Sequence, residues 1–360
     1  MFDHRHYVPV LKWKQGEYLA LSKLAAPIKA SITPLIEIPP IGWDFEESRL
    51  SKTVDDHLKK FGRRLRQKWG DRPIFVDLWL IDPNMLTKGG LTPLECAFQD
   101  AQAEGAHPVP VTGIHREASY QDAVRCIVQA SKQGVCFRLE LEDWADPASL
   151  TKLQKLLADF GLRANEADVV LDLKAPNFMP IEGFTKLLGA VYPAFASAEP
   201  WRTVTIAGTA FPKSMGGIDS GSHLVTRCEW LAYKAFVTAN KGKVRIPTFG
   251  DYAIAHPQLP KEDMRKLKPA ATIRYTVDDA WHITKGANVR DNGFGQYVQH
   301  CRDLASSAHF LKATFSAGDQ YIYDCSQRLA KTGTLTTWRW VGTNHHITKL
   351  VTDLANFFGP

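Results

Sequence analysis

Long apolar runs are missing from this sequence. No stretch of 18 consecutive apolar residues occurs in its 360 residues, and a membrane-spanning helix needs about that length. The opening, MFDHRHYVPV, has no apolar segment behind its charges, whereas a signal peptide would have one. The sequence therefore predicts a cytoplasmic protein without a membrane partner.

Several short motifs that identify catalytic or metal sites are also absent. The cysteines stand apart at 96, 126, 136, 228, 301 and 325, with no CxxC pair, so we expect reduced, buried thiols and no zinc knuckle. The order Gly-Lys-Ser/Thr of a P-loop does not occur. Nothing matches a dinucleotide fingerprint, a Ser-His-Asp elbow or a zinc deaminase motif, and those chemistries are excluded.

Acidic residues are slightly outnumbered, which gives a net charge of +6. The segment KKFGRRLRQK at 59–68 alone carries six basic side chains and no acidic one. Such a block can lie along a phosphate backbone, but Asp55 and Asp56 just upstream favour a solvated helix face. Nucleic acid is therefore not expected as the primary ligand.

What the sequence does contain is a regular alternation of strand and helix patterns. Eight β-rich runs lie at 7–12, 32–38, 73–80, 108–114, 135–141, 168–173, 203–207 and 244–249. Helical patterns lie between them, at 16–29, 51–69, 92–104, 119–132, 148–160, 181–191 and 222–238. Eight such units predict a parallel (β/α)8 barrel, with an open doubly wound sheet as the alternative.

Charges within these strands favour the barrel. A parallel strand that helices cover on both faces should be almost wholly apolar, yet charged residues recur at every second position near the strand ends. They are Lys12, Lys14, Glu37, Asp77, Arg138, Glu140, Asp172 and Lys174. We expect these side chains to point inward, toward the barrel end where water and ligand have access.

The pattern changes after the eighth strand. Residues 271–276 and 280–286 read as a β-hairpin, followed by helices near 293–311 and 318–330 and a final helix at 347–358. We therefore divide the chain into barrel strands with their helices (1–250), an insertion on the catalytic face (251–345) and a closing helix of the barrel (346–360).

Both ends of the chain resemble the bacterial and phage beta family of proteins. The segments that carry this resemblance are YVPVLKWKQGEYLAL from residue 7, ITPLIEI from residue 32 and WRWVGTNHHIT from residue 338. The resemblance implies a setting in mobile elements or beside phage-defence genes. It supplies no established catalytic residues.

The inward charged set is the strongest candidate site. Catalytic groups of barrel enzymes come from the carboxyl ends of several strands, so Glu37, Asp77, Glu140, Asp172 and Lys174 are predicted as catalytic groups. Lys12, Lys14 and Arg138 are predicted to bind ligand. Carboxylates beside cations can act as acid and base, or hold a divalent cation as a cofactor. The alternative is a charge-balanced interior that only fixes strand register.

The loop after the seventh strand suggests a second contact. Lys213, Gly216 and Gly217 precede the helix expected to start near 222. Backbone amides, a lysine and a helix N-terminus together favour an anion, and barrels often bind phosphate at this position. A surface loop with Ser222 as an ordinary N-cap is the alternative.

Two histidine segments complete the candidates. His345 is predicted as an acid or base, with Arg339 and Trp340 binding a planar anionic ligand. Since the insertion must return to the catalytic face, we expect Lys12, Lys14 and Glu37 to share a pocket with Arg339 and His345. A capping turn that packs tryptophans is the alternative. The segment His115-Arg116-Glu117, after the fourth strand, is a further candidate ligand contact, with a plain surface loop as the alternative.

Two functions remain open at this stage. In the first, the barrel binds a phosphorylated or nucleotide-like ligand, with acid–base or metal-assisted hydrolysis by the inward carboxylates. In the second, it is a non-catalytic sensor or interaction module that uses 251–345 to contact a protein from a neighbouring defence gene.

Overall fold

Eight parallel strands close into a barrel in the computed structural model, which describes residues 2–259 and 268–359. In their order around the ring they are β1 (Tyr7–Lys12), β11 (Thr248–Asp251), β9 (Thr203–Ala207), β8 (Ala167–Asp172), β7 (Val135–Glu140), β6 (Val109–Thr112), β5 (Phe75–Asp77) and β2 (Leu35–Glu37). The predicted (β/α)8 barrel is confirmed, and the open sheet is excluded. The second strand is shorter than the predicted 32–38 because Pro34 and Pro39 flank it, and proline has no N–H to give to the ladder.

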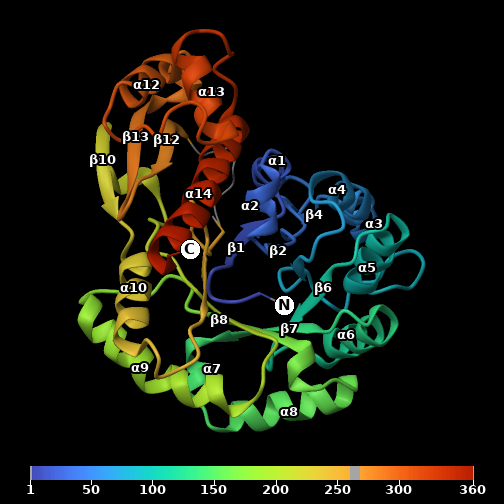
Figure 1. Ribbon diagram of the computed structural model, residues 1–360. Coiled ribbons are helices and arrows are strands. Elements are labelled where there is room, and N and C mark those ends of the chain that lie inside the picture. Colours follow the sequence, from blue (N-terminus) through green and yellow to red (C-terminus); the bar gives the residue numbers. More distant parts are fainter. Residues whose placement is uncertain (1, 260–267, 360) are drawn as a thin grey trace.

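Helices cover the outside of the barrel (Figure 1). Those that follow the strands are α1 (Gln15–Ser22), α2 (Ala26–Ala30), α3 (Val54–Leu58), α4 (Phe61–Lys68), α5 (Pro93–Ala103), α6 (Ala118–Ser131), α7 (Leu141–Ala145), α8 (Ala148–Phe160), α9 (Ile181–Ala198), α10 (Cys228–Asn240) and α14 (Leu335–Phe358). The main hydrophobic core lies between these helices and the strands. Among the described residues, no helix has both the length and the hydropathy that crossing a membrane requires.

The barrel interior is divided along its axis. Apolar side chains, among them Val8, Leu35, Phe75, Val109 and Val170, form a separate buried cluster inside the ring. At the carboxyl ends of the strands, Lys12 lies in register with Glu37, and Glu37 with Asp77. The barrel interior is therefore apolar toward the amino ends of the strands and charged at the mouth, where the carboxyl ends lie.

A second sheet stands beside the barrel and is built from two separate loops (Figure 1). Its order is β10 (Gly221–Thr226), β13 (Ala280–Asn288) and β12 (Ala270–Thr276), all antiparallel. The hairpin predicted at 271–286 is confirmed. The helix predicted to begin near 222 is wrong, because residues 221–226 pair with β13 and α10 begins at Cys228. The sheet is thus not confined to residues 251–345.

The helices of this region are shorter than predicted. They are α11 (Val289–Asn292), α12 (Gln296–Ala305) and α13 (Ala317–Ser326). Together with the sheet they enclose a second hydrophobic core that includes Tyr275, Tyr297 and Trp338. Residues 260–267 of the predicted insertion lie outside the described residues, and the division at 250 and 345 stays a prediction.

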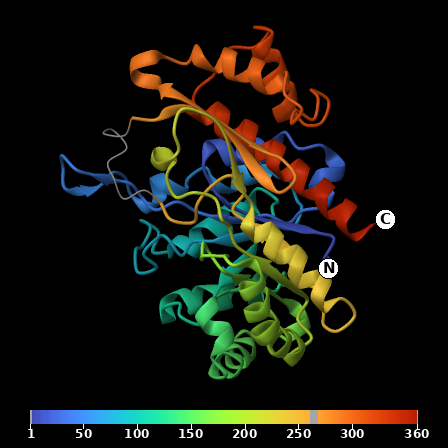
Figure 2. The same cartoon turned by 90° about the vertical axis from the view of Figure 1, so that its left-hand side faces the viewer.

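The last helix begins much earlier than the predicted residue 347. Helix α14 runs from Leu335 to Phe358, so the WRWVGTNHH segment is helical. Its first half packs on β12 and α13 and its second half on the barrel. Figure 2 shows this single helix passing along both parts, and the hairpin of β3 (Trp43–Asp44) and β4 (Arg49–Leu50) extending away from the barrel.

Candidate functional site at the barrel mouth

Arg138 joins three carboxylates at the mouth of the barrel. Its Nη1 donates to Glu37 Oε1 (2.9 Å) and to Asp77 Oδ2 (3.0 Å). Its Nε and Nη2 donate to Asp172 Oδ2 at 3.0 and 2.7 Å. These four side chains come from β7, β2, β5 and β8, so they point into the barrel as their common parity predicts.

Two further cations balance the carboxylates. Lys12 Nζ donates to Glu37, and Arg116 Nη2 donates to both oxygens of Asp77 at 3.2 and 3.0 Å. Three buried carboxylates therefore meet three cations, and the layer is electrically neutral. This is the arrangement expected for an interior that fixes register, so a role in chemistry has to come from groups that remain accessible above it.

The charge states of the network follow from these contacts. Burial alone would raise the pKa of Glu37, but Arg138 and Lys12 outweigh it and lower the pKa. Burial acts to lower the pKa of Arg138, and the surrounding acidic groups raise it well above its usual range. Tyr252 accepts from Arg138 Nη2 (2.8 Å) and donates to Asp172 Oδ2 (2.7 Å). Burial beside Asp172 raises the pKa of Tyr252, so its hydroxyl keeps the proton that it donates.

A cavity of about 230 Å³ opens directly above this layer. Arg138 and Asp172 form its floor, and Trp79, His115, Arg116, Asp143, Glu140 and Lys174 line its walls. Glu140 is 55% exposed and pairs with Lys174, which is 41% exposed. The expectation that Glu140 points inside is therefore corrected: β7 ends at this residue, and its carboxylate stands on the rim.

The cavity walls carry two groups that can contact a ligand. Trp79 is 40% exposed and is fixed by its Nε1, which donates to Glu37 Oε1 at 2.8 Å. The Arg116 guanidinium lies 5.9 Å from the centre of the Trp79 ring. Among the described residues, Nε and Nη1 of Arg116 have no hydrogen-bond partner. An aromatic face and unused guanidinium donors thus face the same space.

His115 adjoins Arg116 in the loop after β6 and also lines the cavity. Its Nε2 is 2.7 Å from Asp143 Oδ1, and its side chain is 70% exposed. A carboxylate that holds one nitrogen of an imidazole leaves the other nitrogen free to exchange a proton with a ligand. This pair has the geometry of an oriented acid or base. The sequence alone predicts His115 only as a ligand contact.

The carboxylates do not gather around a common point. No group of three or more His, Cys, Asp or Glu residues suited to a metal ion occurs within residues 2–259 and 268–359. The acidic side chains of the mouth are bonded to guanidinium and ammonium groups instead.

The loop after β9 has a different construction from the one predicted. Residues Met215–Gly217 form one 3₁₀ turn, and Gly216 N donates to Ser214 Oγ at 3.0 Å. Lys285 donates to the carbonyl oxygens of Met215 and Ile218. Because the chain continues into β10, no helix N-terminus follows this loop. The predicted contacts of Lys213, Gly216 and Gly217 with an anion therefore lose that support.

The structure separates the C-terminal candidates. His345 is fully buried, with Nδ1 2.8 Å from Asp319 Oδ2 and Nε2 2.8 Å from the Thr276 carbonyl oxygen. Trp340 packs on Tyr321 and is 8% exposed. Neither lines the cavity above Glu37, because the helical form of 338–346 turns both into the second core. Arg339 does reach the mouth, where it lines a narrow pocket with Lys12, and Lys14 follows β1 as an exposed residue.

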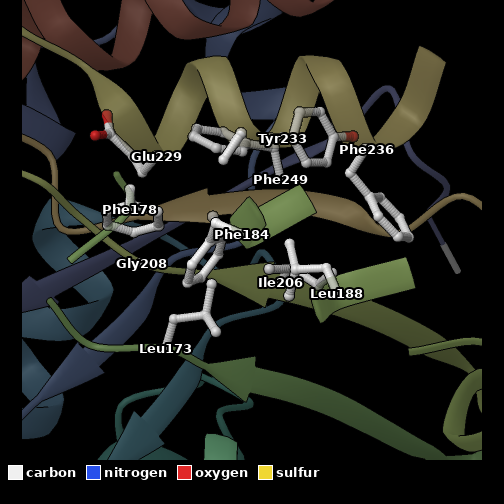
Figure 3. A pocket seen from close by; sticks show the side chains of 12 residues that line it. Leu173, Phe178, Phe184, Leu188, Ile206, Gly208, Glu229, Tyr233, Phe236 and Phe249 are labelled. Carbon is white, nitrogen blue, oxygen red and sulfur yellow. The ribbon is translucent and has the colours of Figure 1, made fainter. Parts of the chain in front are cut away.

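A third pocket lies outside the ring, between α9, α10 and the strands (Figure 3). Its walls are aromatic and aliphatic, and Glu229 is the single acidic residue among them. The volume is only about 10 Å³, which leaves room for about one water molecule. We assign it no ligand.

Sequence reasoning missed Trp79, Asp143 and Tyr252, whereas Arg116 belongs to the predicted segment 115–117. Tyr252 lies one residue past the end of β11, in a loop that a barrel presents at its catalytic face. The position after each strand is the signal that could have found them.

Comparison with known proteins gives the family of the chain. Among solved structures, a mutant tryptophan synthase alpha-subunit from Pyrococcus furiosus is 13% identical, with a TM-score of 0.37, over 70% of this chain and 88% of that one. Triosephosphate isomerase from Bartonella henselae is 13% identical, with a TM-score of 0.33, over 68% and 92%. At this level neither bears on the chemistry of the site, and no curated protein matches. The sequence model of the Beta protein family matches residues 7–352, and the chain belongs to that family.

Proposed function

We propose that the protein binds a small anionic ligand, phosphorylated or nucleotide-like, in the cavity at the barrel mouth. The observation that carries this proposal is the pairing of Arg116, whose Nε and Nη1 have no partner among the described residues, with the half-exposed face of Trp79. A guanidinium N–H donates charge-assisted hydrogen bonds to phosphate oxygens, which are roughly twice as strong as neutral ones. An aromatic face adds a stacking surface for a planar group.

The neutral layer beneath the cavity supports this role. The guanidinium of Arg138 already donates to Glu37, Asp77 and Asp172, so it holds the floor in place and offers no unpaired charge. Lys174 stands on the rim beside Glu140. An incoming anion would meet the Lys174–Glu140 pair at the rim and Arg116 on the wall, and the buried carboxylates are screened by their own cations.

Binding is tested by calorimetry with nucleoside mono- and diphosphates. We expect Arg116→Gln to weaken binding roughly 10- to 100-fold, since a hydrogen bond to a charged group contributes about 1.5–3 kcal/mol. Arg125→Gln is the matched control, because Arg125 is an exposed α6 residue paired with Asp122. No saturable binding by the wild type, or equal affinity in both variants, would contradict the proposal.

Acid–base hydrolysis is a second candidate function, favoured by the His115–Asp143 pair on the cavity wall. In this reading His115 exchanges a proton with the bound ligand and Asp143 orients the ring. Turnover of a phosphorylated substrate that is lost in His115→Ala, with ligand affinity kept, is the expected result. Ligand affinity without turnover would leave a binding module.

The cellular setting of the protein is part of this proposal, and it is inferred from the sequence. We infer a phage-defence or mobile-element context, and a protein partner for residues 251–345, from the family segments at the two ends of the chain. We infer a cytoplasmic location from the lack of long apolar runs in the sequence.

A further inference from the structure

Two arginines converge on one oxygen where the second sheet joins the barrel. Arg274 on β12 and Arg339 on α14 each donate from Nη1 to the carbonyl oxygen of Ile254, at 3.0 and 3.1 Å. Ile254 lies just after β11. The two guanidinium groups thus come from different elements and are held beside each other at the carboxyl end of the barrel.

Their positive charges are only partly compensated. Among residues 2–259 and 268–359, the carboxylate paired with these arginines is that of Glu17, whose Oε1 lies 3.7 Å from Arg339 Nε. The remaining N–H groups of both arginines have no partner among the described residues. Burial, together with the charge of Arg339, lowers the pKa of Arg274. Two cations with one carboxylate in a half-buried place form a site that an anion would stabilise.

More basic groups surround the same place. Partial burial lowers the pKa of Lys14, and the charges of Arg339 and Lys12 act in the same direction. His256 lines the adjoining pocket, and its pKa is lowered by partial burial and by the charge of Lys213. Lys14, which follows β1, and Lys213, which follows β9, therefore add to the positive potential.

We propose that Arg274 and Arg339 form an anion site for a single phosphate-type group, separate from the cavity that contains Arg116. The adjoining pocket, lined by Lys12, Glu17, His256 and Arg339, holds only about 10 Å³. A large ligand cannot enter it, so the group binds outside it, beside Arg339, which lines the pocket, and Arg274, which shares the Ile254 carbonyl oxygen with Arg339. The site goes beyond the proposed function, because it needs neither Arg116 nor Trp79.

Gly16 on α1 provides a test that leaves the charge unchanged. A Cβ atom at this position would lie 2.3 Å from Arg339 Cγ and 2.6 Å from Arg339 Cβ. Alanine at 16 therefore pushes the start of α14, together with Arg339, away from α1 without removing a cation. Gly189 is a suitable control, since a Cβ there meets no atom within 4 Å.

The experiment is calorimetric titration with inorganic phosphate in an Arg116→Gln background. We expect one phosphate to bind in this background, at least tenfold more weakly when Arg274→Gln or Gly16→Ala is added, and unchanged when Gly189→Ala is added. Urea unfolding of each variant verifies that it is folded at the titration temperature.

The outcomes separate this site from the proposed function. Loss of all phosphate binding in Arg116→Gln alone overturns the second site and leaves the cavity as the anion site. Binding that survives both Arg274→Gln and Arg339→Gln also overturns it. Binding that depends on Arg274 but not on Arg116 supports the second site and removes the evidence for the first.

Discussion

Arg138 is the residue on which the barrel mouth depends most. Its side chain is 7% exposed and bonds the carboxylates of Glu37, Asp77 and Asp172. Arg138→Met would leave these three with Lys12 and Arg116 alone, and an uncompensated buried charge costs about 3–5 kcal/mol. We expect that loss in the free energy of unfolding, measured by urea denaturation.

Arg125→Met is the control for this change. Arg125 is 43% exposed and forms an i,i+3 pair with Asp122 at 2.8 Å. Exposed pairs of this kind contribute about 0–1 kcal/mol. If the two arginine variants lost equal stability, the buried network would not be what stabilises the mouth.

The same residues show what a strand pattern can predict. Glu37, Asp77, Arg138 and Asp172 lie within strands, where the period of two fixes the face of each side chain. Arg116 and Tyr252 lie after their strands, where no period applies and tertiary contacts decide the direction. Parity therefore identified the floor of the cavity, and Glu140 and Lys174 on its rim. The position after a strand identified His115 and Arg116, while Trp79 and Tyr252 had to come from the structure.

Two elements differ from their predicted form because tertiary contacts decide their structure. The segment GSHLVT was read as part of a helix, but its β-branched residues and alternating exposure fit strand β10. The start of α14 is rich in threonine and contains Gly342, which lowers helix propensity. A Cβ at Gly342 would lie 2.7 Å from the Arg274 carbonyl oxygen, so close packing on β12 accounts for this glycine and for the longer helix.

Thr276 links three elements through two adjacent histidines. Its carbonyl oxygen accepts from His345 Nε2, and its Oγ1 lies 2.7 Å from His346 Nδ1. His346 Nε2 is 2.9 Å from Asp251 Oδ2 at the end of β11. A carboxylate only accepts, so His346 carries its proton on Nε2 and Thr276 donates to Nδ1. The second sheet is thereby bonded to the barrel through α14.

Thr276→Val should loosen this junction. The variant keeps the shape of the side chain but leaves the buried His346 Nδ1 without a donor, at a cost of about 1–3 kcal/mol. We expect that loss in urea unfolding, and faster amide hydrogen exchange in β12 and β13. Thr238→Val is the control, because that exposed hydroxyl donates only to Lys234 within α10. Equal exchange rates in the two variants would contradict the linkage.

At the scale of the whole molecule, α10 and α14 meet the barrel around a second buried ionic cluster. Arg227 is fully buried, with Nε 3.6 Å from Glu229 Oε1 and Nη1 3.6 Å from Asp353 Oδ2. Both distances are too long for direct hydrogen bonds. Glu229 also faces the aromatic pocket of Figure 3 and the nearby charge of Asp251. Its carboxylate is therefore poorly solvated and only partly compensated.

This environment predicts a distinct pH dependence of global stability. Burial raises the pKa of Glu229 from 4.5 to about 7, although Arg227 opposes the shift. A carboxyl whose folded pKa is raised stabilises the protein fully below pH 4.5, and this contribution is lost as the pH rises through about 7. The loss is on the order of 3 kcal/mol, since one pKa unit corresponds to about 1.4 kcal/mol.

The variant Glu229→Gln tests this prediction, because a glutamine cannot ionise. We expect its unfolding free energy relative to wild type to increase by that amount between pH 4.5 and about 7. Urea denaturation at several pH values measures this difference. Groups that do not interact with Glu229 titrate alike in both proteins and cancel in the difference. Parallel pH profiles for the two proteins would mean that Glu229 is already ionised in the fold, with Arg227 as an effective counter-ion despite the 3.6 Å separation.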